Sequence, residues 1–168
     1  MVIAGSAVLA APAPFITRYA SAQFGGIATV VRYTVARPDR GETRFVFLSA
    51  PDAGALPEEV QVVAGNADVV QLSNIEGADC TLAHVEIVTG ARPLVMSAVR
   101  VFSPRLEDNV QSEPAAMDIQ RYRPEPGGDP GESGIVLRAD GPPVRSGPLC
   151  DGAAIRRAML ATVGQGRR

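Results

Sequence analysis

The sequence predicts an all-β protein: a single antiparallel β-sandwich or barrel-like domain of about eight short strands, with one α-helix at its C-terminus. Runs of β-branched residues recur along the chain, and turn signals separate them at intervals of roughly eight to twelve residues. The 14 prolines and 17 glycines favour many turns over long helices. A chain of 168 residues, 46% of them apolar, fits one domain with enough apolar material for a core.

The predicted strands are runs of β-branched and aromatic residues, because such side chains suit a pleated sheet. Turns separate several of them, for example RPDRG at 37–41 and Gly65-Asn66. The stretches 124–131 (PEPGGDPG) and 141–148 are expected to be loops, and the first is too rich in Pro and Gly for regular structure. The predicted strands cover residues 27–36, 43–50, 60–64, 67–73, 82–88, 94–102, 115–123 and 133–139.

Residues 82–88 and 94–102 form the clearest strand pair, and the segment 89–93 (TGARP) between them reads as a hairpin turn. Apolar residues occur on both faces of the second strand. This pattern predicts an interior strand that is covered on each side. One face holds Leu94, Met96, Ala98 and Phe102, and the other holds Val95, Val99 and Val101.

The predicted helix begins at Asp151 and ends at Val163. The carboxylate of Asp151 can accept hydrogen bonds from the free N–H groups of the first turn. Ile155, Met159 and Val163 recur at i, i+4 and i+8, and they predict one apolar stripe. Gly164 follows where a C′ glycine would end a helix.

The first 22 residues differ in composition from the rest of the chain. Residues 2–16 (VIAGSAVLAAPAPFI) are an apolar run of small residues, and ASA at 20–22 fits an A-x-A cleavage pattern. This segment resembles a bacterial secretory signal peptide, and its Ala-Pro-Ala-Pro run is similar to twin-arginine export signals, although no Arg-Arg pair precedes Val2. The alternative is a buried N-terminal segment of the folded protein. The apolar run of about 15 residues is too short to span a bilayer, so no stable membrane span is expected. Cleavage after Ala22 would leave a β-rich domain of residues 23–168.

The two cysteines, Cys80 and Cys150, indicate a disulfide if the protein is exported. The bridge would close a loop of about 70 residues, for which the chain-entropy account gives roughly 4 kcal/mol of stabilisation. It would hold the terminal helix against the sheet edge. A redox role is disfavoured because no C-x-x-C pair is present. Zinc is disfavoured because it takes about four nitrogen or sulfur ligands, and the chain has two cysteines and one histidine.

Two sets of residues loosely match catalytic or metal-binding patterns. The segments around His84 and Ser133 resemble, in type and order, those of trypsin-like proteases, but three inserted residues break the Gly-Asp-Ser-Gly run and the chain is too short for two barrels. Glu125, Asp129 and Glu132 offer oxygens to Ca²⁺, but their spacing matches no Ca²⁺ loop. We therefore expect neither an enzyme nor a bound metal or cofactor.

Arginines occur within most predicted strands, and all 16 basic residues are arginine. If several share one sheet face, they form a cationic patch that recognises carboxylate or phosphate. The alternative is an ordinary solvent face on which arginines pair with acids of neighbouring strands. The formal net charge of −2 argues against nucleic-acid binding, which needs a basic surface. The candidate ligand-binding residues are Arg32, Arg100, Arg121 and Arg123, and Arg44 and Arg138 lie in further strands.

These features predict an exported protein that is periplasmic or secreted. The absence of a plausible catalytic set favours a non-enzymatic interaction module, an accessory subunit that docks on another envelope protein through a sheet edge or face. The alternative is a small-ligand binding protein that holds an anionic group on its Arg-bearing sheet face.

Overall fold

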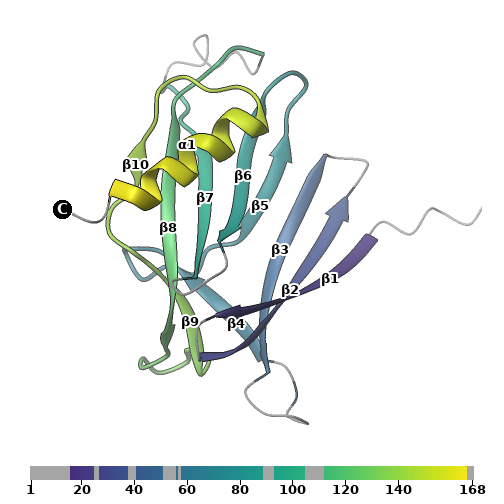
Figure 1. Cartoon of the computed structure of the whole chain (residues 1–168), viewed down its shortest axis with the longest axis vertical. Coiled ribbons are helices and arrows are strands. Elements are labelled where there is room, and N and C mark those ends of the chain that lie inside the picture. Colours follow the sequence, from purple (N-terminus) through teal and green to yellow (C-terminus); the bar gives the residue numbers. More distant parts are fainter. Residues whose placement is uncertain are drawn as a thin grey trace, which may run out of the picture.

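Ten strands and one helix make up the part of the chain that the computed structural model describes, and Figure 1 shows their arrangement. The described residues are 16–24, 27–37, 41–50, 56, 58–88, 93–104 and 112–165, with the backbone alone described for 16–24, 27–37, 50, 164 and 165. The elements are β1 (Ile16–Phe24), β2 (Ile27–Arg37), β3 (Glu42–Ala50), β4 (Glu58–Val63), β5 (Leu72–Glu76), β6 (Thr81–Val88), β7 (Leu94–Arg100), β8 (Met117–Pro126), β9 (Ile135–Ala139), β10 (Val144–Arg145) and α1 (Gly152–Gln165).

The strands from β3 to β9 form a closed ring of backbone pairing, in the order β3-β4-β9-β8-β7-β6-β5 and back to β3. Residues 42–45 of β3 pair with β5, and residues 47–49 pair with β4. β2 pairs along the whole of β3, so β4 and β5 must share the other edge of that strand. Among the described strand pairs only β4 with β9 is parallel. Of the two predicted forms, the barrel-like one is therefore confirmed.

The ring encloses an apolar core, because alternate residues of each strand point to its inside. Tyr122 lies in this core, and its hydroxyl hydrogen-bonds the buried side chain of Ser97. Burial raises the pKa of Tyr122, and the bond to Ser97 opposes this rise. The core cluster consists of Phe45, Phe47, Val60, Val62, Leu72, Val85, Val95, Tyr122, Ile135 and Leu137.

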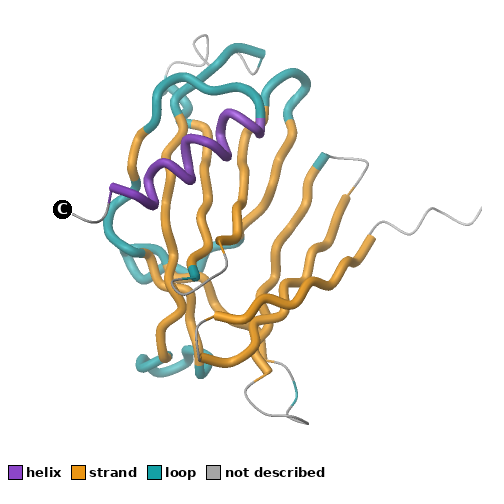
Figure 2. Tube along the Cα trace, viewed as in Figure 1, coloured by secondary structure: helices purple, strands orange, loops and turns teal. Residues whose placement is uncertain are grey.

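A second apolar cluster fills the space between the outside of the ring and α1. Met96 of β7 and Met117 of β8 are fully buried there against Ile155 and Met159 of α1. The helix crosses the strands on the outer face of the sheet (Figure 2). Val95, the neighbour of Met96, belongs to the core inside the ring. β7 is therefore covered on both faces, as its sequence predicts.

Every predicted strand overlaps an observed one, but the boundaries of two are wrong by three residues or more. Of the run 67–73, residues 67–71 have only the bridge between Val63 and Val69 as strand pairing, and β5 begins later, at Leu72, because Leu72–Glu76 pairs with β3 and β6. β8 continues to Pro126, into a stretch that was expected to be a loop. Beyond Tyr122, β8 pairs with β9 alone, and a strand edge without a partner tolerates proline.

Two observed strands lie where the sequence predicts none. β10 is a two-residue strand inside the expected loop 141–148, and it pairs with residues 118–119 of β8. β1 begins at Ile16, inside the predicted signal segment, and ends at Phe24, beyond the predicted cleavage point. The turn predicted at 89–93 lies outside the described residues, apart from Pro93.

The start of α1 agrees with the sequence prediction, because the Oδ1 atom of Asp151 accepts a hydrogen bond from the Ala154 N–H at 2.8 Å. The helix continues to Gln165, so Gly164 does not end it. α1 has 14 residues. No helix of the described residues is both long and apolar enough to cross a membrane.

The predicted apolar stripe of α1 is wrong at its last position. Val163 is 36% exposed, whereas Thr162 is 7% exposed. At roughly 100° per residue, Thr162 lies about 20° from Ile155 around the helix axis and Val163 about 80°. The buried hydroxyl of Thr162 donates to the Met159 carbonyl oxygen at 2.7 Å, so its burial leaves no unpaired donor.

We predict that Met159→Ala lowers the free energy of unfolding by about 2–5 kcal/mol, because it empties a fully buried site between α1 and β7. The matched control is Val163→Ala on the same helix, which should change stability by no more than about 0.5 kcal/mol. Urea unfolding monitored by circular dichroism measures both. Equal losses from the two variants would contradict the observed orientation of α1.

The raised pKa of Tyr122 predicts a loss of stability at alkaline pH. The unfolded chain releases this phenolic proton near the ordinary pKa of about 10, and the folded protein holds it to higher pH. The contribution is constant below that pH and is lost as the pH rises through the folded pKa. Urea midpoints between about pH 8 and about pH 11 should fall less steeply for Tyr122→Phe than for the wild type. Parallel curves would show that Tyr122 titrates normally.

Candidate functional site

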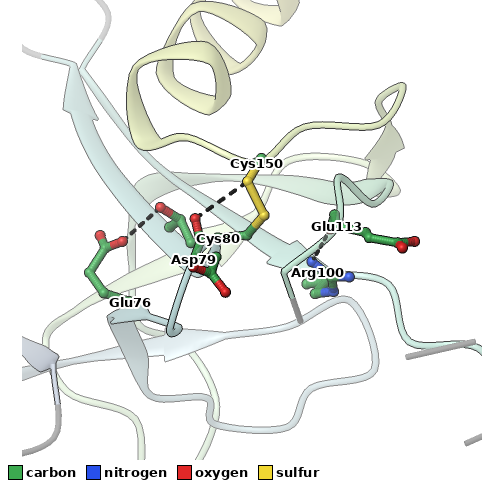
Figure 3. Close-up of a disulfide and its surroundings, with 7 residues drawn as sticks. Glu76, Asp79, Cys80, Arg100, Glu113 and Cys150 are labelled. Carbon is green, nitrogen blue, oxygen red and sulfur yellow. Dashed lines mark hydrogen bonds between the residues drawn. A yellow bond between two sulfur atoms is a disulfide. The ribbon is translucent and has the colours of Figure 1, made fainter. Parts of the chain in front are cut away.

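The disulfide predicted between Cys80 and Cys150 is present and joins the start of β6 to the residues just before α1 (Figure 3). The main chains also meet there, since the Thr81 N–H donates to the Cys150 carbonyl oxygen at 2.8 Å. Gly77 allows the tight turn before Cys80: its N–H donates to the Cys80 carbonyl oxygen, and a Cβ at this position would lie 2.5 Å from that oxygen. The side chain of Cys80 is buried.

The bridge holds α1 against the outer face of the sheet, rather than against the sheet edge that the sequence suggests. α1 contacts β6 and β7. An ion pair of 2.9 Å between the Arg156 Nε and Glu86 Oε2 atoms links the first half of α1 to β6. Near the other end of the helix, the Nη1 atom of Arg121 donates to the Thr162 carbonyl oxygen at 3.3 Å. A cation at this end is favourable, because the carbonyl groups of the last helical turn carry partial negative charge.

His84 lies on β6 beneath the start of α1. A Cβ placed on Gly152 would be 3.7 Å from the His84 Nδ1 atom, so helix and imidazole are packed closely. The His84 Nε2 atom is 3.9 Å from the Glu86 Oε2 atom, is buried, and makes no hydrogen bond. Glu86 already pairs with Arg156. The contacts of His84 are therefore those of a side chain packed between helix and sheet.

Ser133 and His84 belong to different parts of the molecule. Ser133 precedes β9, where its hydroxyl donates to the Ile135 carbonyl oxygen at 2.6 Å and lies 3.4 Å from the Gln61 N–H of β4. Its contacts are to its own loop and to β4, whereas His84 is packed under α1. The two residues do not form the nucleophile and base of a protease.

Two of the three acids considered for Ca²⁺, Glu125 and Glu132, are engaged with other groups. Glu132 accepts hydrogen bonds from the N–H groups of Gly128 and Asp129, and these bonds, together with Arg138, lower the pKa of its carboxyl group. Arg138 also lies 3.4 Å from the Glu125 carboxylate. Within the described residues no three His, Cys, Asp or Glu side chains gather in a way that could hold a metal ion.

The candidate arginines whose side chains are described do not all meet on one open face. Arg100 is 5% exposed, and its Nη1 atom donates to the Glu113 carbonyl oxygen at 2.9 Å (Figure 3). Arg44 lies 4.0 Å from Glu42, with half of its side chain exposed. Arg100 is therefore not available for a cationic surface shared with Arg44. Arg32 lies in β2, where the backbone alone is described.

Arg121 and Arg123 are the one predicted pair that the structure brings together, and Asp140 joins them. The Nε atoms of Arg121 and Arg123 are 3.7 Å and 2.8 Å from the Asp140 Oδ2 atom. Asp140 follows β9 directly, so it reaches β8 through the β8–β9 pairing. Sequence reasoning did not single out Asp140, because the register that places it beside β8 is a long-range property. This arrangement matches the alternative in which arginines pair with acids of neighbouring strands.

A small cleft opens where β4 and the segment 69–71 separate from β3, and its volume is about 160 Å³. The Gln71 side chain reaches across to the Phe45 carbonyl oxygen at 2.7 Å. Pockets for small ligands usually measure about 300–1,000 Å³. No arginine is among the described residues that line this cleft, so it does not match the predicted anion site.

The hairpin of β1 and β2 lies outside the ring, and β1 forms the margin of the whole sheet (Figure 1). β1 pairs with β2 from Ile16 opposite Ala36 to Phe24 opposite Ile27. Its other edge has no partner strand among the described residues. Such an edge presents a row of backbone N–H and C=O groups to any strand that approaches it.

No known protein family, curated protein or solved structure matches this chain.

We predict that replacing both cysteines, Cys80→Ser with Cys150→Ser, lowers the free energy of unfolding by about 2–5 kcal/mol, because the unfolded chain loses its cross-link. Urea unfolding of the exported protein measures this loss. Wild-type protein unfolded in the presence of reductant should reach the same midpoint as the double variant. Two alkylatable thiols in native, non-reduced protein would contradict the disulfide.

Proposed function

We propose that this protein is an exported, non-catalytic interaction module that docks on another protein of the bacterial envelope through the margin of its sheet. The observation that carries the proposal is that β1 and β2 extend the sheet beyond the closed ring, so that the outermost strand, whether β1 or β2, has an edge without a described partner strand. The ring strands are paired on both sides along much of their length, so most of the remaining backbone is already hydrogen-bonded.

The periplasm, or the space outside the cell, is the proposed location. Disulfides form and persist in oxidising compartments, and the bridge between Cys80 and Cys150 fits such a compartment. The signal-like composition of the first 22 residues supports the same location independently.

The alternative, an anionic ligand on an Arg-bearing face, has less support. Arg121 and Arg123 already share Asp140, and Arg100 is buried against Glu113. An anion would have to displace these partners, and the described lining of the cleft beside β3 includes no arginine. Recognition by the backbone of a sheet edge needs no such displacement.

Site-specific photo-crosslinking in the native cell envelope tests the proposal. A photoreactive residue is placed in turn at Thr34 of β2, Val144 of β10 and Arg157 on the exposed side of α1. We expect adducts with one envelope protein, strongest from position 34, and position 157 serves as the matched control. If no position gives an adduct while the protein is exported and folded, the interaction function is wrong.

A further inference from the structure

The predicted cleavage point divides β1. The strand covers Ile16–Phe24, and cleavage after Ala22 would leave only Gln23 and Phe24 of it. In the observed register, Ala22 lies opposite Val30 and Ile16 lies opposite Ala36. Removal of the signal segment would therefore leave residues 30–36 of β2 without a partner strand on the side where β1 had paired.

β2 would keep its other neighbour after this loss. Its residues 29–37 pair with residues 50–42 of β3, and β3 belongs to the ring. A strand held firmly on one edge and unpaired on the other is a template for strand addition. The vacant stretch has the length of the strand that occupied it, so the backbone at this place accommodates an antiparallel partner.

We propose that processing converts β2 into the docking edge, and that an extended segment of the envelope partner adds to it in the place of β1. This inference rests on the proposed function and names the surface and the kind of partner that serve it. Main-chain hydrogen bonds supply the affinity, and the cross-strand side-chain pairs supply the specificity.

The charge of β2 indicates which segment fits best. Arg32 lies in the middle of β2, and the strand contains no acidic residue. In the unprocessed register the residue opposite Arg32 is Ala20, which is uncharged. A partner segment with Asp or Glu at that position gains a cross-strand ion pair, whereas a second copy of β2 paired about Arg32 sets Arg opposite Arg. The fitting partner is therefore an extended, β-branched segment with an acid opposite Arg32, rather than a second copy of this chain.

Hydrogen exchange on the two forms of the protein tests whether processing frees this edge. The processed form is purified after export of the full chain, and the unprocessed form is made in an oxidising cytoplasm, where the disulfide can form without signal cleavage. Alternate amides of residues 30–36, those directed to β1, should exchange at least about tenfold faster in the processed form. Amides of β7 are the control and should exchange equally in both forms.

A synthetic peptide tests strand addition at the freed edge. The probe is ITRYASAQF, the sequence of β1, and it should bind the processed form and protect residues 30–36. The same peptide with Ala20→Glu should bind about two- to five-fold more tightly, and Tyr19→Pro should abolish binding because it disrupts strand pairing. The unprocessed form should bind none of the three peptides, because β1 already occupies the edge.

Several results would overturn the inference. The inference is wrong if the exported protein still begins at Met1, or if residues 30–36 exchange equally in both forms. It is also wrong if the processed form does not bind the peptides. A processed form that elutes as a dimer with β2 protected would assign the edge to a second copy. If photo-crosslinks to an envelope protein arise only away from β2, an interaction with that protein stands, but docking through the sheet margin and this inference both fail. If no crosslink arises but the peptides bind, the edge is open and the interaction function fails.

Discussion

The burial of β7 on both faces is the constraint on which the rest of the structure depends. Its Val95 belongs to the core inside the ring, and its Met96 belongs to the cluster under α1. A helix of 14 residues is only marginally stable in water by itself, so α1 depends on packing for its position. The disulfide holds the start of α1 beside β6, and Met159 then covers the outer face of β7. The ring and the helix are therefore parts of one folding unit.

Several arginines link one structural element of the protein to another. Arg156 joins the helix to β6, Arg121 reaches the helix end, and Arg138 holds the loop before β9 through Glu132. Exposed ion pairs of this kind contribute at most about 1 kcal/mol each, so their main effect is on geometry. Because these arginines already pair with groups of the same protein, a partner would be recognised mainly through backbone and apolar groups.

Closure of the ring leaves most of its strands paired on both sides, and it leaves the free edge on the hairpin outside the ring. Exposed edges invite aggregation, so proteins usually cover or shorten them. Here β1 covers one edge of β2, and most of β1 lies in the segment whose cleavage on export we propose. Under that proposal, the edge of β2 would be covered before export and open to a partner strand afterwards.

The sequence by itself determined the class of the fold, the approximate positions of eight of the ten strands, the N-cap at Asp151 and the disulfide, because these depend on local periodicity, turn chemistry and the number of cysteines. Only the tertiary structure decided that the strands close into a ring, that β8 runs on through Pro124, that Thr162 rather than Val163 faces the sheet, and that Asp140 joins Arg121 to Arg123. Each of these depends on which segments become neighbours. Strand pairing brings together residues far apart in the chain, and a single sequence carries no local signal of that register.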